Sequence, residues 1–125
     1  GGITMAKKVL IVDDMLFMRA ALKKILEGLD CEVVGEAENG EQGIEMYKRL
    51  KPDLTTMDIT MPVMDGLQAL ESIRKLDNAA KVVMVSAMGQ EKNVMTAIQL
   101  GAKNFIVKPF NADKVKEIVN PILNG

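Results

Sequence analysis

The chain has 125 residues, of which 48% are hydrophobic, and its 16 basic and 17 acidic residues give a net charge of −1. This length suits one domain with a substantial core. The balanced charge argues against a protein that binds nucleic acid through excess positive charge, and the 3% of aromatic residues argue against a base-stacking surface. Histidine is absent, so no residue of this chain can supply an imidazole base, metal ligand or phosphohistidine.

The N-terminus and the single cysteine indicate a cytoplasmic protein. Cys31 has no partner in the chain for a disulfide, and no signal peptide opens the sequence. The apolar runs at 9–12 and 82–85 are far too short to span a bilayer. Residues 1–4 precede Met5 and are interpreted as an expression remnant, which leaves residues 5–125 as one domain.

Five short apolar segments predict β-strands, at residues 8–12, 32–36, 53–57, 81–85 and 104–107. The first and fourth contain continuous aliphatic runs, which are typical of central parallel strands covered on both faces. The segments between the strands, and the segment after the last strand, have apolar residues at helical spacing. This alternation predicts an α/β fold, a doubly wound five-stranded parallel sheet with five helices.

The helical segments have apolar stripes that we expect to pack on the sheet. The stripes are Met18, Leu22, Ile25 and Leu29; Ile44, Tyr47 and Leu50; Leu67, Leu70 and Ile73; Val94, Ala97 and Ile98; and Val115, Ile118, Val119 and Ile122. Gly28 and Gly101 are expected as left-handed helix caps and Asn111 as an N-cap. We expect most of the ten methionines in the core, with Met88 as the one surface candidate.

Polar residues follow four of the predicted strands. Asp13 and Asp14 follow the first, Asp58 the third, Ser86 the fourth and Lys108 the fifth. Taken singly, each is explained by a helix cap, a turn or a surface lysine. Parallel strands bring their carboxyl ends to one edge, however, and two carboxylates about 4 Å apart repel by roughly 4 kcal/mol at an effective dielectric constant near 20. Three carboxylates without histidine or cysteine therefore point to a hard cation such as Mg²⁺.

Four motifs, each at a strand end, make the chain resemble a response-regulator receiver domain of the chemotaxis type. They are residues 9–14 (VLIVDD), 57–66 (MDITMPVMDG), 86–87 (SA) and 108–110 (KPF). The resemblance covers nearly all of residues 5–123. It implies the flavodoxin-like strand order 2-1-3-4-5 and a phosphoprotein of a two-component signalling system.

The same resemblance implies a phosphorylation site around Asp58. Asp58 is expected to accept the phosphoryl group. Asp14, Asp58 and the main-chain carbonyl of Thr60 are expected to bind Mg²⁺, with Asp13 acting through a metal-bound water. Lys108 and the Ser86 hydroxyl are expected to bind phosphoryl oxygens.

Further roles follow from the resemblance. Ser86 and Phe105 are expected to form the switch that signals on the face of the fourth helix, fifth strand and fifth helix. The Lys108–Pro109 peptide is expected to be cis. Thr60 and Met88 are expected to tune the lifetime of the phosphate, which should be long because neither is an acid or an amide.

The partners implied are a CheA-like histidine kinase as phosphodonor and a flagellar motor switch protein or another target on the signalling face. The resemblance also allows a separate phosphatase as a further partner. We expect a monomer that binds neither nucleic acid nor membrane, and that catalyses only its own phosphotransfer and slow dephosphorylation.

Three alternatives compete with this interpretation. An aspartate-nucleophile phosphatase needs an acid two residues after its nucleophile on the first strand, where this chain has Met15. A flavodoxin-type cofactor binder needs a phosphate loop where the chain has two aspartates at 13–14. A receiver cut from a longer transcriptional regulator is the third, and we favour a stand-alone switch because the sequence ends directly after the fifth helix.

Overall fold

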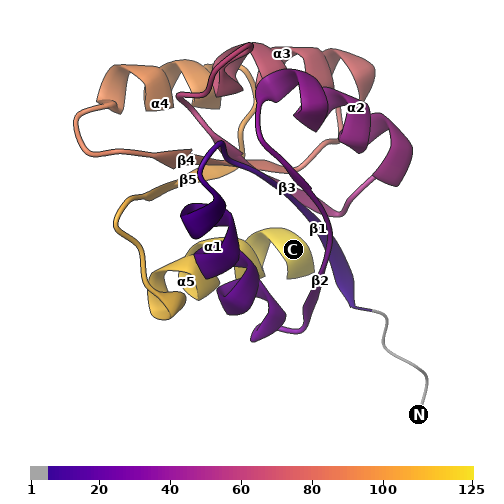
Figure 1. The fold of residues 1–125 in the computed structure, drawn as a ribbon, viewed down its shortest axis with the longest axis vertical. Coiled ribbons are helices and arrows are strands. Elements are labelled where there is room, and N and C mark those ends of the chain that lie inside the picture. The colour runs from indigo at the N-terminus through magenta and orange to yellow at the C-terminus, as the bar shows by residue number, and fades with distance from the viewer. Residues whose placement is uncertain (1–5) are drawn as a thin grey trace.

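The computed structural model of the chain describes residues 6–125, in which five strands alternate with five helices (Figure 1). The strands are β1 (Lys7–Val12), β2 (Cys31–Ala37), β3 (Leu54–Asp58), β4 (Val82–Ser86) and β5 (Asn104–Val107). The helices are α1 (Leu16–Glu27), α2 (Gly40–Leu50), α3 (Gly66–Leu76), α4 (Glu91–Gln99) and α5 (Ala112–Asn124). Across residues 6–125, no helix has the length and apolar character needed to cross a membrane. The remnant expected at residues 1–4 lies outside the described residues.

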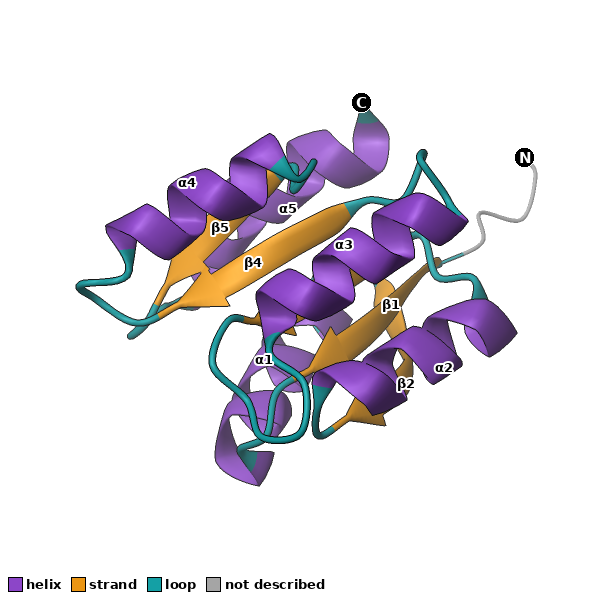
Figure 2. Cartoon of the chain, turned by 90° about the horizontal axis from the view of Figure 1, so that it is seen from above, coloured by secondary structure: helices purple, strands orange, loops and turns teal. Residues whose placement is uncertain are grey.

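All paired strands are parallel, and the sheet order is β2-β1-β3-β4-β5. The predicted doubly wound, flavodoxin-like fold is therefore confirmed. Helices α2, α3 and α4 cover one face of the sheet and α1 and α5 cover the other (Figure 2). Because every strand points the same way, the carboxyl ends of the strands share one edge with the amino ends of the helices.

The continuous apolar run of β1 reflects burial on both faces of the sheet. Leu10 and Val12 pack in the core beneath α2, α3 and α4, whereas Val9 and Ile11 pack in the core beneath α1 and α5. All four side chains are at most 1% exposed. A strand covered on one face only would alternate apolar with polar residues, so the run itself encodes the two-layer cover.

Three strands end one residue later than the sequence predicts, and β2, which ends at Ala37, is one of them. β3 ends at Asp58 and β4 ends at Ser86, because Asp58 lies opposite Val85 and Ser86 lies opposite Val107 in the parallel ladder. Both polar residues are therefore strand residues rather than the first residues of loops. Their backbones are held by the sheet, which places their side chains more rigidly than a loop would.

Of the three helix caps predicted from the sequence, two are present and one is not. Asn111 caps α5 by accepting a hydrogen bond from the Lys114 amide, and Gly101 has a positive φ of 105° after α4. The left-handed cap predicted at Gly28 is wrong, since Gly28 has a φ of −68°. The chain continues in a tight turn, and the left-handed residue is Asp30, with a φ of 62°, just before β2.

Helix α4 exposes more apolar surface than its sequence predicts. Ala97 is fully buried, but Ile98 is 44% exposed, so the stripe expected to pack on the sheet is only partly correct. Met88 is exposed as predicted, and Met15 and Met95 are exposed as well. The apolar residues of α4 are divided between the core and the surface because α4 is short and lies beside β5 at the edge of the sheet.

Candidate functional site

Two aspartates follow β1 at the carboxyl edge of the sheet. The Asp13 amide donates to the Ala37 carbonyl of β2 across 3.0 Å, and its Oδ1 accepts from the Met15 amide across 2.9 Å. These bonds hold the buried Asp13 side chain over the end of β1, while Asp14 is exposed. The alternative that the aspartates simply cap α1 is wrong, because the N-cap is Met15 and no side chain caps the helix.

Asp58 lies at the centre of the same edge. It is the last residue of β3, which pairs with β1 on one side and β4 on the other, and it is buried. One carboxylate oxygen from each of Asp13, Asp14 and Asp58 lies within 4.8 Å of the other two. We call these three residues the acidic cluster. The convergence expected from the strand ends is therefore present.

Lys108 supplies a positive charge to the acidic cluster. Its Nζ lies 3.2 Å from Asp13 Oδ2 and 3.5 Å from Asp58 Oδ2. The Lys108 amide donates to the Ser86 carbonyl across 2.7 Å, which continues the pairing of β5 with β4. The lysine is thus mostly buried and paired rather than a solvated surface residue. The Lys108–Pro109 peptide is cis, as predicted.

The surroundings of Asp58 change its acidity. Burial is the main reason that the pKa of Asp58 rises from 3.8 to about 6, and the Asp13 carboxylate adds to the rise. The Lys108 ammonium lowers the pKa and so limits the effect. A carboxyl with this pKa is still mainly ionised at neutral pH, so Asp58 can act as a nucleophile without a general base.

The acidic cluster fits a hard divalent cation. It offers only oxygen ligands, and Mg²⁺ prefers oxygen and keeps several waters, so a few carboxylates suffice. Three carboxylates and one ammonium leave two negative charges uncompensated, which is the charge that a divalent cation balances.

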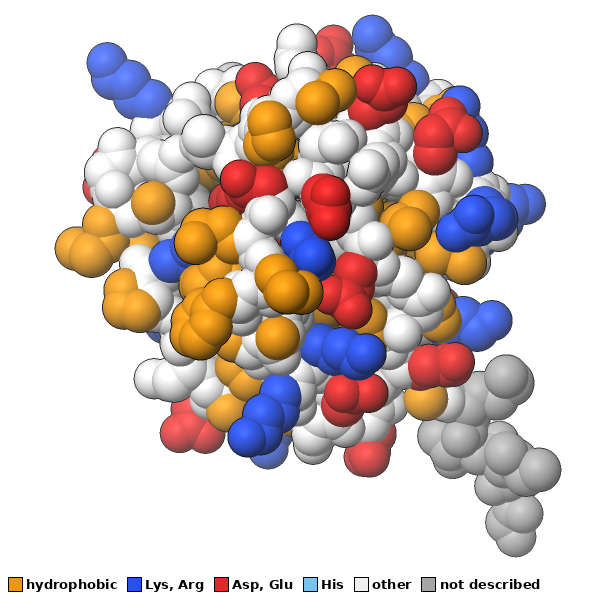
Figure 3. Space-filling model, in the orientation of Figure 1, with side chains coloured by type: hydrophobic (Ala, Val, Ile, Leu, Met, Phe, Trp, Pro, Cys, Tyr) orange, Lys and Arg blue, Asp and Glu red, His pale blue; other side chains and the backbone are white. Residues whose placement is uncertain are grey.

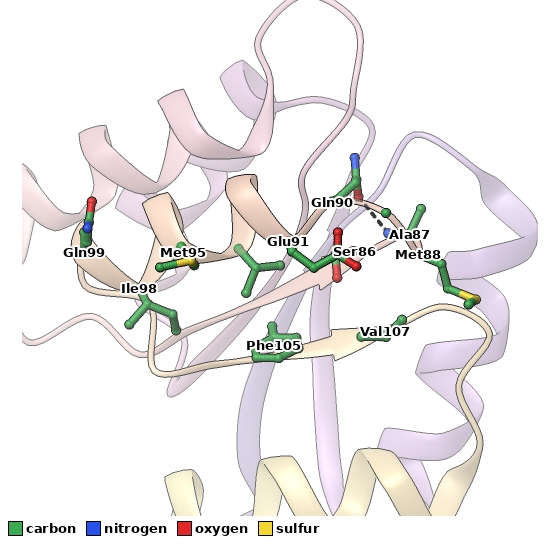
Figure 4. Close-up of a pocket in the computed structure, with 12 residues that line it drawn as sticks. Ser86, Ala87, Met88, Gln90, Glu91, Met95, Ile98, Gln99, Phe105 and Val107 are labelled. Carbon is green, nitrogen blue, oxygen red and sulfur yellow. Dashed lines mark hydrogen bonds between the residues drawn. The ribbon is translucent and has the colours of Figure 1, made fainter.

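Ser86 and Phe105 both line a groove between α4 and β5. The groove has a volume of about 630 Å³, and its apolar lining includes Met88, Met95, Ile98, Phe105 and Val107 (Figure 4). Ser86 is buried at the end of β4, and Phe105 is 36% exposed. Phe105 is therefore not an ordinary core residue. Hydrophobic side chains also gather between α4 and α5 in the space-filling view (Figure 3).

The two expected lifetime residues lie in neighbouring loops. Thr60 is exposed, and its hydroxyl accepts a hydrogen bond from Gln90 Nε2 across 2.9 Å. Met88 is 79% exposed in the loop between β4 and α4. The structure thus places both residues outside the buried part of the site. Gln90, which contacts Thr60, was not predicted from the sequence.

Arg19 is a second residue that the sequence prediction missed. It is buried in α1, donates from Nη1 to the Asp13 carbonyl across 2.8 Å, and donates from Nε to Glu36 Oε1 across 3.2 Å. It therefore ties the Asp13–Asp14 peptide to β2. The sequence pattern could have revealed this residue, because Arg19 lies on the same face of α1 as Leu22 and Leu26, and an arginine is unexpected on a buried apolar face.

Gly66 supports the site from the other side. A Cβ at this position would collide with the main-chain carbonyl of Asp58, so only glycine allows α3 to begin here. The Gly66 amide donates to the Ile59 carbonyl across 2.8 Å, which closes the loop that follows Asp58. Asp65 and Gln68 form a capping box that fixes the first turn of α3.

A comparison with known families matches residues 9–120 to the response regulator receiver domain. The chain belongs to this family. The matched range contains the acidic cluster, Ser86 and Lys108. The receiver fold and the converging strand-end residues therefore agree with the family assignment.

The most informative relatives are chemotaxis proteins named CheY. The CheY of Bacillus subtilis (strain 168) is 58% identical over 120 residues, which covers 96% of this chain and 100% of that protein. The CheY of Thermotoga maritima is 53% identical over 118 residues, which covers 94% of this chain and 98% of that protein. The chain is therefore a CheY-like response regulator.

Solved structures agree with this assignment. The CheY chain of a CheX–CheY–BeF3–Mg²⁺ complex from Borrelia burgdorferi superposes with a TM-score of 0.91 at 38% identity, covering 95% of this chain and 90% of that chain. The response regulator domain of Thermotoga maritima CheB gives a TM-score of 0.88 at 36% identity, covering 96% and 98%. The comparisons favour neither the phosphatase nor the flavodoxin-type alternative.

Proposed function

We propose that Asp58 is the phosphoacceptor of this CheY-like response regulator. A carboxylate oxygen of Asp58 forms a bond to phosphorus as the P–N bond of a partner's phosphohistidine breaks, which gives an acyl phosphate and frees the imidazole. The observation that carries this proposal is the convergence of buried Asp58 with two further carboxylates and Lys108 at one sheet edge.

The acidic cluster is proposed to hold Mg²⁺ during this transfer. Asp14, Asp58 and the Thr60 main-chain carbonyl are the proposed ligands, with Asp13 acting through a metal-bound water. When bound, the ion supplies positive charge against which two anions can approach each other. The support is the oxygen-only donor set and its two uncompensated negative charges.

Lys108 and Ser86 are proposed to hold the phosphoryl oxygens. Lys108 already lies 3.5 Å from Asp58 Oδ2, and Ser86 ends the neighbouring strand. Charge-assisted hydrogen bonds contribute about 1.5–3 kcal/mol each, so two contribute about 3–6 kcal/mol. A two-state equilibrium moves from 1:99 to 99:1 with about 5.5 kcal/mol, so these two bonds are large enough to operate a switch.

The switch is proposed to act through Ser86 and Phe105. As the Ser86 hydroxyl moves toward the phosphoryl group, it leaves space in the groove, and the Phe105 ring turns inward to fill it. The partly exposed ring in the lining of the groove supports this motion. The changed surface is the face of α4, β5 and α5, where the exposed Met95 and Ile98 offer apolar contact to a target.

The proposed partners are a CheA-like histidine kinase and a flagellar motor switch protein or another target. A separate phosphatase is the proposed third partner, and the Borrelia CheY, which is named in a complex with CheX, shows that a CheY can bind a further protein. We propose a cytoplasmic monomer with one receiver domain over residues 5–125. Residues Thr60 and Met88 give slow phosphoryl loss, because neither is suited to hold an attacking water.

Intact mass spectrometry tests the central role of Asp58. Incubation with Mg²⁺ and acetyl phosphate should add the mass of one phosphoryl group to the wild-type chain and none to Asp58→Asn. Asp53→Asn is the matched control, because Asp53 precedes β3 at the opposite edge of the sheet. Equal labelling of Asp58→Asn would contradict the proposal.

A turnover assay tests whether the chain acts on other substrates. Incubation with Mg²⁺ and a small phosphate monoester should release no more phosphate than buffer does. If the wild type releases more than one phosphate per protein molecule and Asp58→Asn releases none, the result would favour a phosphatase over a signalling protein. The decay of the acyl phosphate in the purified chain, followed in parallel, should be slow.

A further inference from the structure

The loops that follow Asp58 and Ser86 are joined by one side chain. Gln90 Oε1 accepts from the Ala87 amide across 2.7 Å, and Gln90 Nε2 donates to Thr60 Oγ1 across 2.9 Å. Figure 4 shows the Gln90 side chain turned toward Ala87, with this first bond drawn. We call these two hydrogen bonds the Gln90 clasp. The clasp spans residues 30 positions apart in the chain.

The Gln90 side chain takes part in this contact and does not cap the helix. Gln90 is the N-cap of α4, yet its side chain makes no capping hydrogen bond. Asn, Asp, Ser and Thr are preferred at this position because their short side chains reach the first amides of the helix. The side chain of Gln90 instead uses Oε1 within its own loop, at the Ala87 amide, and uses Nε2 to reach Thr60 in the neighbouring loop.

We propose that Gln90 is a positioning residue that holds Ser86 in its unphosphorylated position. Ser86 and Ala87 are joined by a peptide bond, so a shift of Ser86 toward Asp58 carries the Ala87 amide with it. Gln90 cannot simply follow, because its second bond ties it to Thr60, two residues after Asp58. The clasp therefore opposes the switch and has to open when Ser86 moves.

The loop between Ser86 and Gln90 has few packing contacts to hold it in place. Gly89 has a φ of 90°, and a Cβ there would meet nothing within 4 Å. Met88 is also largely exposed. Packing therefore contributes little to holding this loop, which leaves the hydrogen bonds of Gln90 as the main restraint on it.

The inference rests on the proposed phosphorylation of Asp58, so beryllofluoride with Mg²⁺ serves as the probe of the phosphorylated state. Gln90→Met keeps the length of the side chain and removes both hydrogen bonds. It should bind beryllofluoride about fivefold more tightly, the factor for one net hydrogen bond of about 1 kcal/mol. Affinity for Mg²⁺ alone should not change, because the acidic cluster is untouched. Isothermal titration calorimetry measures both affinities.

Two further variants make the test specific. Thr60→Val removes one arm of the clasp and should also tighten beryllofluoride binding, and the double variant with Gln90→Met should gain less than the sum of the two effects. Gln99→Met, on the same helix and groove, should bind as the wild type does. In Gln90→Met, the Ala87 amide should exchange its hydrogen faster by NMR.

The outcomes separate this inference from the proposed function. Wild-type protein that binds no beryllofluoride overturns the phosphoacceptor role and the clasp with it. Wild-type binding with unchanged or weaker binding by Gln90→Met overturns the clasp alone. Gln90→Ala is measured beside Gln90→Met, so that a packing effect of methionine is distinguished from the loss of the hydrogen bonds.

Discussion

Arg19 donates a hydrogen bond from Nη1 to the main-chain carbonyl of Asp13 across 2.8 Å. That carbonyl belongs to the peptide that links Asp13 to Asp14, so a buried guanidinium orients the backbone between two members of the acidic cluster. The same arginine pairs with Glu36 of β2. The position of the cluster therefore depends on a residue that is not part of it.

Arg19→Met should lower both stability and metal affinity. The substitution leaves the Asp13 carbonyl without its donor, which costs about 1–3 kcal/mol. Glu36 is partly exposed and can be rehydrated, so the loss should stay within that range. Urea denaturation measures the stability, and Mg²⁺ titration should show weaker binding.

Lys23→Met is the control for Arg19→Met. Lys23 also approaches Glu36, with Nζ 3.9 Å from Oε2, but it is half-exposed and does not reach Asp13. Its loss should change stability by less than about 1 kcal/mol and leave Mg²⁺ affinity as it is. Equal effects of the two substitutions would show that Arg19 acts only through charge on β2.

Gly66→Ala should disturb the site through the backbone of Asp58. The new methyl group would collide with the Asp58 carbonyl, and backbone rather than a flexible side chain would have to move. We expect a loss of about 3 kcal/mol, the upper part of the range for overpacking, and slower phosphorylation by acetyl phosphate. Gly89→Ala, which meets open space, should cost only about 1–2 kcal/mol for its left-handed φ. Comparable losses would contradict the steric explanation.

Asp58 should make stability fall as the pH rises from about 4 to about 6 in metal-free buffer. The folded chain binds the Asp58 proton more tightly than the unfolded chain does, because the pKa is raised from 3.8 to about 6. The contribution is fully present below the unfolded pKa and is lost as the pH passes the folded pKa. Asp58→Asn lacks this titration, so its stability relative to the wild type should rise by about 2 kcal/mol between pH 4 and pH 7.

Denaturation of both proteins with chelator at pH 4 and pH 7 measures this effect. Effects of the other titrating groups are shared by the two proteins and largely cancel in the difference. Added Mg²⁺ at pH 7 should stabilise the wild type more than Asp58→Asn, since the variant lacks one proposed ligand. A stability difference that is the same at both pH values would refute the raised pKa.

Tyr47 should titrate above the ordinary range for tyrosine. It is largely buried in α2, and its hydroxyl donates to Asp77 Oδ2 across 2.8 Å, so burial first and then this bond raise the pKa of Tyr47. Because this is the only tyrosine and tryptophan is absent, ultraviolet titration reports it alone. Asp77→Asn should lower the pKa without affecting phosphorylation, since both residues lie at the edge opposite Asp58. A pKa near 10 in the wild type would contradict the contact.

Much of the fold was predictable because local sequence encodes it. The apolar run 9–12 is buried on both faces, so its lack of alternation predicted a covered parallel strand. Polar residues that follow such runs lie at the carboxyl edge of the sheet in any parallel topology, so Asp13, Asp58 and Lys108 could be expected to meet. These predictions needed only periodicity and strand direction.

The tertiary structure alone decided which side chains support and restrain that site. Arg19 meets Glu36 across 17 residues and Gln90 meets Thr60 across 30, and no local pattern encodes such pairings. The need for glycine at position 66 follows from where the Asp58 carbonyl lies, and the exposure of Ile98 follows from the position of α4 beside the edge strand. Helix and strand periods depend on neighbours in sequence, whereas these contacts depend on how whole elements pack.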